Sequence, residues 1–106
     1  MDKPNEPHYD VVWPRSRLAV DKQTPAPRLD TLAGKRIGFL WDYLFRGEEL
    51  FPAIADELRD RFADIEFVSF ETFGNTHGGD EAKVIGALPK NLREHRIDAV
   101  ISGNGC

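Results

Sequence analysis

The chain has 106 residues and a mass of 12.0 kDa, enough for one domain. Hydrophobic residues make up 41% and charged residues 30%, as in ordinary soluble globular proteins. The net charge of -4, with no run of basic residues, gives no signal for nucleic acid or membrane as a partner. The single cysteine excludes an intrachain disulfide, and a reducing cytoplasmic compartment is expected.

The first third of the chain, residues 1–34, is expected to form an extended arm. It contains five prolines, which are Pro4, Pro7, Pro14, Pro25 and Pro27. Proline disrupts helices and favours extended or turn conformations. Between the prolines lies a short apolar piece, and we expect Val11, Val12 and Trp13 to pack on the core or on a neighbouring subunit. The alternative is a disordered leader.

Residues 35–106 are expected to form the N-terminal part of an α/β domain. Residues 36–42 are almost continuously apolar, which is typical of a strand buried on both faces. Residues 48–62 carry apolar side chains four positions apart and predict a helix. Residues 65–71 alternate between apolar and polar side chains and predict a second strand.

A second helix is expected after Asp80, whose carboxylate can accept hydrogen bonds from the amides of the first turn. Pro89 should kink or split this helix. Residues 97–102 read as a third, buried strand. The order strand, helix, strand, helix, strand predicts a Rossmann-like, three-layer α/β fragment with a parallel three-stranded sheet and two crossover helices. With no further helix in the sequence, we expect apolar area near Val100 to stay exposed.

Three loops are expected to meet at the carboxyl edge of this sheet, where open parallel sheets gather their ligands. They are residues 41–47, 72–79 and 103–106. The candidate catalytic residues are Cys106, Asp42 and His77. The candidate substrate-binding residues are Gly103, Asn104, Gly105, Asn75, Thr76 and Arg46. No metal-ligand set and no flavin or nicotinamide fingerprint is present, so no cofactor is expected.

Cys106 follows a strand and a glycine-rich turn, a frequent position for a nucleophilic cysteine. A helix N-terminus after it would favour the reactive thiolate. Gly103, Asn104 and Gly105 suit a tight turn with unusual backbone angles. The plainer readings remain open: a lone cysteine is often a small buried hydrophobe, and a loop histidine such as His77 is often only solvated.

Two segments resemble the UGSC family. Residues 32–40, LAGKRIGFL, look like its opening strand, and residues 96–106, RIDAVISGNGC, look like the strand that leads into its signature. That signature is selenocysteine or cysteine followed by Gly-Ser-Cys. The resemblance spans roughly residues 29–106. It implies a thiol or selenol enzyme, with redox or nucleophilic chemistry at the turn after the third strand.

Three explanations for a chain that stops at this point stay open. A UGA selenocysteine codon read as a stop would end the product just before the signature. Alternatively, Cys106 stands at the first signature position, or a partner chain supplies the remaining strands. In each case this chain alone is expected to be inactive.

The alternative function is a non-catalytic subunit or binding module of a heteromeric α/β enzyme, docking through its arm and an exposed sheet edge. One half of a racemase-like enzyme, with a cysteine on each of two lobes, also fits the topology. The expected partners are a second copy or another chain that completes the sheet, together with a small-molecule substrate.

Overall fold

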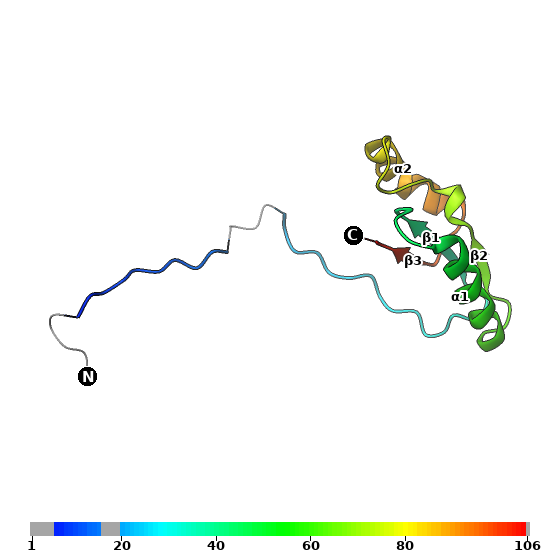
Figure 1. The fold of residues 1–106 in the computed structure, drawn as a ribbon. Coiled ribbons are helices and arrows are strands. Elements are labelled where there is room, and N and C mark those ends of the chain that lie inside the picture. The colour runs from blue at the N-terminus through cyan, green and yellow to red at the C-terminus, as the bar shows by residue number, and fades with distance from the viewer. Residues whose placement is uncertain (1–5, 16–19, 106) are drawn as a thin grey trace.

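The computed structural model describes residues 6–15 and 20–105 of the chain. Its elements are β1 (Arg36–Trp41), α1 (Gly47–Arg61), β2 (Glu66–Val68), the short 3₁₀ helix η1 (Phe70–Thr72), α2 (Glu81–Glu94) and β3 (Ala99–Gly103). The strands form one parallel sheet in the order β2-β1-β3. The expected α/β alternation is therefore confirmed, with β1 in the centre (Figure 1).

The core lies between α1 and one face of the sheet. Phe39 of β1 and Phe51 of α1 are both buried, and their ring centroids are 4.8 Å apart. Phe67 of β2 stacks on Phe39 at 5.4 Å. Trp41 and Ala55 complete this buried cluster. Because α1 contributes only a narrow apolar stripe, aromatic rings supply most of its contact with the sheet.

The opposite face of β1 is filled by the residues that flank α2. Side chains alternate along a strand, so Gly38 faces away from Phe39. A Cβ at Gly38 would lie 3.3 Å from the ring of Phe73 and 3.4 Å from Ile97. His95, which follows α2 at its C-cap, contacts the same Phe73 ring. Val100 lies beside Gly38 in β3 and stays 39% exposed, so the expected apolar exposure is present.

The prediction of a second strand over residues 65–71 is wrong beyond Val68. The side-chain oxygen of Ser69 accepts a hydrogen bond of 3.3 Å from the amide of Glu71, and this bond begins η1. Serine side chains that bond to their own backbone compete with strand pairing. Phe70 thereby turns onto Trp41, with ring centroids 4.8 Å apart, and joins the aromatic core.

For α2, the predicted split at Pro89 and the predicted side-chain cap by Asp80 are wrong, whereas a kink at Pro89 stays a prediction. The helix is not split at Pro89 but runs through it from Glu81 to Glu94. Asp80 stands at the N-cap position, yet its side chain makes no capping hydrogen bond; only its carbonyl accepts from the Val84 amide, at 3.0 Å. In the described part of the chain, no helix combines the length and apolar character needed to cross a membrane.

The described residues of the arm up to Thr31 do not pack on the domain. All residues described between 6 and 31 are exposed, including Val11 at 90% and Trp13 at 76%. Figure 1 shows the arm running away from the sheet. The expectation that Val11, Val12 and Trp13 cover the chain's own core is therefore wrong, because they contact none of it. Packing on a neighbouring subunit stays a prediction.

Candidate functional site

The carboxyl edge of the sheet is organised around Asp42, the residue after β1. Asp42 is only 5% exposed. Its Oδ2 accepts a hydrogen bond of 2.7 Å from the amide of Gly105, and its Oδ1 accepts one of 3.2 Å from the amide of Leu44. Its own amide donates to the carbonyl of Gly103 at 3.3 Å. One residue thus ties the loop after β1 to the turn after β3.

The turn after β3 is packed closely against the loop after β1. A Cβ at Gly103 would lie 2.6 Å from the ring of Phe45 and 2.7 Å from that of Phe51. A Cβ at Gly105 would lie 2.7 Å from the Cβ of Leu44. The expectation of unusual backbone angles is wrong, since the positive-φ glycines are Gly34 and Gly74. Gly103 and Gly105 are needed instead because their backbones lie too close to neighbouring side chains to leave room for a Cβ.

The loop after β1 carries a strained residue beside this contact. Tyr43 has φ +62°, in the left-handed region that is costly for residues with a side chain. The Leu44 amide that follows is one of the two donors to Asp42. Such strain persists where surrounding contacts hold it, and it clusters at functional loops. The strain was not predicted, because tyrosine carries no local signal for a left-handed turn.

The loop after β2 joins the same edge through its backbone. Asn75 forms a parallel bridge with Trp41, and the amide of Thr76 donates to the Trp41 carbonyl at 3.2 Å. The side-chain oxygen of Asn75 accepts from the amide of His77 at 2.9 Å. The three loops predicted to converge do therefore meet at the end of β1.

The remaining candidate residues lie at the rim. His77 is exposed, and its Nδ1 lies 3.8 Å from Glu81 Oε2. Arg46 pairs with Glu49 at 2.6 Å on the surface of α1. Asn104 is exposed and accepts a hydrogen bond of 3.3 Å from the Ser102 hydroxyl. Cys106 lies outside the described residues, so the predicted catalytic role of Cys106 is not tested by the geometry.

A buried donor near this edge escaped sequence reasoning. Trp41 is 7% exposed, and no described residue accepts a hydrogen bond from its indole Nε1. The ring of Trp41 is enclosed by aromatic neighbours, among them Tyr43, Phe45 and Phe70. A buried tryptophan N–H normally has a partner. The high density of aromatic residues between positions 39 and 51 is the signal that could have marked this cluster.

Comparison with known families decides the identity of the chain. The model of the UGSC family matches residues 10–106. The chain belongs to the UGSC family. The match begins inside the arm, so residues 10–35, which precede β1, lie within the matched region. No curated protein and no solved structure matches the chain.

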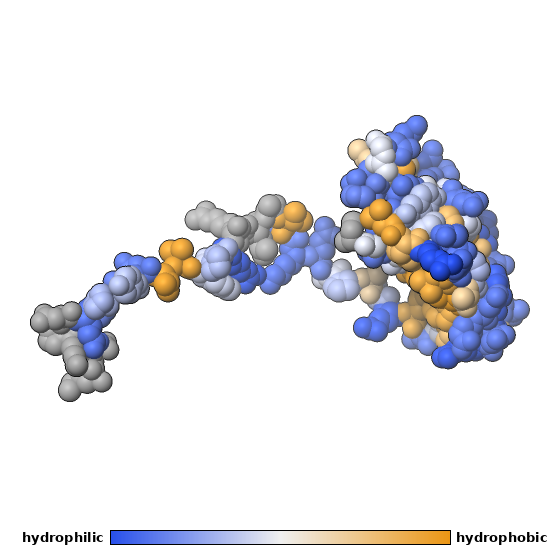
Figure 2. Space-filling view, viewed as in Figure 1, coloured by the Kyte–Doolittle hydropathy of each residue, from blue (hydrophilic) through white to orange (hydrophobic). Residues whose placement is uncertain are grey.

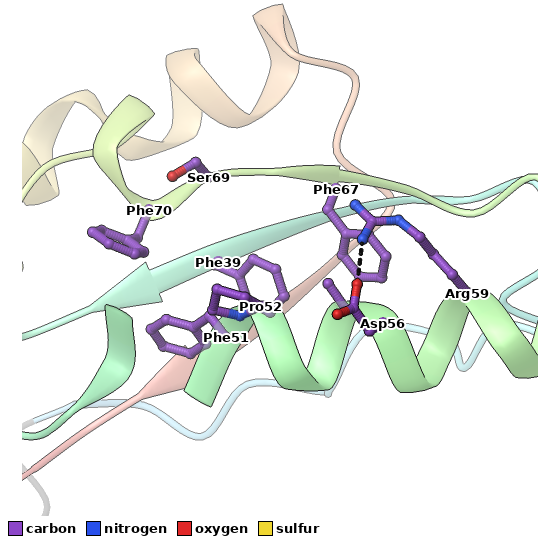
Figure 3. A pocket seen from close by; sticks show the side chains of 9 residues that line it. Phe39, Phe51, Pro52, Asp56, Arg59, Phe67, Ser69 and Phe70 are labelled. Carbon is purple, nitrogen blue, oxygen red and sulfur yellow. Dashed lines mark hydrogen bonds and ion pairs between the residues drawn. The ribbon is translucent and has the colours of Figure 1, made fainter. Parts of the chain in front are cut away.

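This UGSC-family chain also has a groove outside the carboxyl edge, between α1 and the β2–η1 segment. Its volume is about 270 Å³. Its lining is mainly aromatic and includes Phe39, Phe51, Phe67 and Phe70 (Figure 3). At one end Arg59 pairs with Asp56 at 3.1 Å and lies over the Phe67 ring at 5.0 Å. The groove has few polar groups, so it offers little for orienting a polar substrate.

Metal coordination finds no support in the described geometry. Across residues 6–15 and 20–105, no three His, Cys, Asp or Glu side chains lie close enough together to hold a metal ion. The acidic group at the edge, Asp42, already accepts backbone hydrogen bonds with both carboxylate oxygens.

Proposed function

We propose that this chain supplies the thiol-bearing turn of a UGSC-family thiol or selenol enzyme. Cys106 is the nucleophile or redox group contributed by this chain, alone or beside a selenocysteine of the family signature. Asp42 is a positioning residue that fixes the turn from which the reactive group projects. The substrate is a small molecule with an electrophilic atom, and the thiolate attacks that atom while the leaving group departs with the bonding electron pair.

The hydrogen bond between Asp42 and Gly105 carries this proposal. Its length of 2.7 Å is that of a strong, charge-assisted bond to a carboxylate. Gly105 is the residue directly before Cys106. Burying a carboxylate costs free energy because the charge loses its water. An ordinary surface turn does not need a buried carboxylate to hold its backbone.

The hydrogen bonding of Asp42 favours a positioning role over proton transfer. Each carboxylate oxygen accepts from a backbone amide, one from Leu44 and one from Gly105. The candidate for moving a proton is His77, which is exposed and has a neutral form that can accept one. Asn75, Thr76, Arg46 and Asn104 would form the rim that contacts substrate, with Gly103 and Gly105 giving it room.

The proposal is tested by the reactivity of the thiol. Cys106 is the single cysteine, so iodoacetamide labelling followed by mass spectrometry reports on it alone. We expect the folded chain to be alkylated severalfold faster than the same chain in denaturant. Asp42→Asn should bring the alkylation rate of the folded chain close to that of the denatured chain. The asparagine side chain has a single oxygen and cannot accept hydrogen bonds at both positions that the carboxylate oxygens of Asp42 occupy.

Asp98→Asn is the matched control. Asp98 Oδ2 also accepts a backbone hydrogen bond, 2.9 Å from the Arg36 amide, but at the amino end of β3. This variant should keep the fast alkylation. A folded wild-type chain that reacts no faster than the denatured chain would overturn the proposal, as would equal effects of the two substitutions.

The gene offers an independent test of the selenol alternative. If the family signature is present, codons for Gly-Ser-Cys lie in frame directly after Cys106, or after one intervening UGA or cysteine codon. An unrelated reading frame at that place removes the link between Cys106 and the signature.

A further inference from the structure

The arm contains a segment with the properties of a strand that lacks a sheet. Residues 8–13 lie between Pro7 and Pro14 and contain no proline. Valine, tyrosine and tryptophan, which favour strands, make up most of the segment. Tyr9 is 81% exposed and Val12 is 87% exposed. Figure 2 shows hydrophobic side chains on the arm, well away from the globular part.

The sheet in turn has an unoccupied edge at β3. In the order β2-β1-β3, β3 pairs with β1 alone, and its other edge is free among the described residues. The amide of Asp42 donates to the carbonyl of Gly103 at 3.3 Å, so the backbone groups of Gly103 face β1. Backbone groups alternate in direction along a strand, so those of Ala99 and Ile101 also face β1, and the amides of Val100 and Ser102 turn away from it. They are available to pair with an added strand.

We propose that residues 8–13 of a second copy add as a strand to the free edge of β3, and that two chains exchange their arms reciprocally. β3 is five residues long, close to the length of the segment between the two prolines. Proline has no amide hydrogen, so Pro7 and Pro14 limit the pairing at each end. The added strand would also cover Val100, which a sheet edge otherwise leaves exposed.

The alternation of side chains suits this placement. In a strand, Tyr9, Val11 and Trp13 share one face and Val12 lies on the other. The two faces of β3 differ in the same way: Ile101 faces the aromatic core with Phe39, and Val100 faces the opposite side with Gly38. Apolar side chains of the arm would thus extend both faces of the sheet.

The area available favours a second copy. A buried aromatic side chain removes about 150–250 Å² from water. Tyr9 and Trp13 of two reciprocal arms would therefore contribute about 600–1,000 Å² before the facing surface is counted. Specific interfaces bury about 1,200–2,000 Å² in total, a size that two arms reach and one arm does not. Reciprocal exchange also gives the closed two-fold symmetry usual for homodimers. The family match, which starts at residue 10, includes Val11, Val12 and Trp13 of this segment.

The test combines the oligomeric state with hydrogen exchange in the full chain. Light scattering after size exclusion should give twice the 12.0 kDa of one chain. Val11→Pro removes a backbone donor from the middle of the segment and should convert the dimer to a monomer. Val20→Pro makes the same change elsewhere in the exposed arm and should leave the dimer intact. The amides of Val100 and Ser102 should be protected in the wild type and exchange faster in Val11→Pro.

Three results would overturn the inference. A wild-type chain that stays monomeric at high concentration excludes the exchange. A dimer that survives Val11→Pro must use another surface. A monomer with protected Val100 and Ser102 amides shows that the arm folds onto its own edge strand. Because Cys106 plays no part in these measurements, their failure would leave the proposed thiol chemistry untouched.

Discussion

The carboxylate of Asp42 accepts a hydrogen bond of 2.7 Å from the backbone amide of Gly105, 63 positions further along the chain. This bond connects the ends of two neighbouring parallel strands, β1 and β3, at the edge where such sheets bind ligands. It also positions the residue that precedes Cys106. The bond therefore links the stability of the sheet edge to the placement of the thiol.

Removing the Asp42 carboxylate should destabilise the domain. Asp42→Ala leaves the amides of Gly105 and Leu44 without their acceptor in a partly buried site. A loss of about 1–3 kcal/mol in the free energy of unfolding is expected, since unsatisfied buried donors are costly. Urea denaturation followed by circular dichroism measures it. Asp98→Ala, which removes an exposed acceptor, should cost less; an equal or larger loss there would contradict the role assigned to Asp42.

A methyl group at Gly103 should also be unfavourable. It would meet Phe45 at 2.6 Å and Phe51 at 2.7 Å. Overpacking of this kind costs about 1–3 kcal/mol. The control is Gly86→Ala in α2, where a Cβ meets nothing within 4 Å and alanine should stabilise the helix by about 0.5–1 kcal/mol. Thermal melts of the two variants should shift in opposite directions, and a shift in the same direction would show that the close approach is not real.

The aromatic core predicts a large effect at Phe51. This side chain is buried between Phe39 and Trp41, and Phe51→Ala should cost about 3–5 kcal/mol, enough to unfold most of a small domain. Leu50→Ala, at the adjacent exposed position of α1, should change the free energy of unfolding by less than about 0.5 kcal/mol. Near-ultraviolet circular dichroism distinguishes the two, and an intact aromatic signal in Phe51→Ala would contradict the core described above.

Pro89 should be a weak point of α2. A proline inside a helix provides no amide for the carbonyl four residues earlier, here that of Ile85. Pro89→Ala should therefore stabilise the protein by about 2 kcal/mol, somewhat below the full proline penalty because the unfolded chain also gains freedom. Pro27→Ala, in the exposed arm, should not stabilise it. Equal melting temperatures for the two variants would show that restoring the hydrogen bond to the Ile85 carbonyl does not stabilise α2.

The strands and helices that could be predicted from the sequence are those with an unambiguous pattern. β1 and α1 lie within one residue of the predicted ranges 36–42 and 48–62, because a buried strand and an amphipathic helix have distinct periods. β2 could not be delimited, because Phe70 fits a strand pattern as well as it fits the aromatic core. Ser69 decides between them through a local hydrogen bond.

The site was predictable in its location but not in its contacts. Parallel topology places Asp42, Asn75 and Gly103 at one edge. The sequence does not indicate that Asp42 accepts the Gly105 amide or that Gly103 is packed against Phe45, because both contacts join segments far apart in the chain. The arm shows the converse: its apolar residues predicted burial, but Val11, Val12 and Trp13 are exposed.

Hydrogen exchange at the Gly105 amide tests the central claim most directly. With Asp42 as its acceptor, this amide should exchange as slowly as the amides of β3 that pair with β1, although Gly105 lies outside any strand. Asp42→Asn should accelerate its exchange strongly and leave the Arg36 amide, held by Asp98, unchanged. If Gly105 exchanges at the rate of an unfolded chain in the wild-type protein, Asp42 does not hold the turn before Cys106, and the positioning role is contradicted.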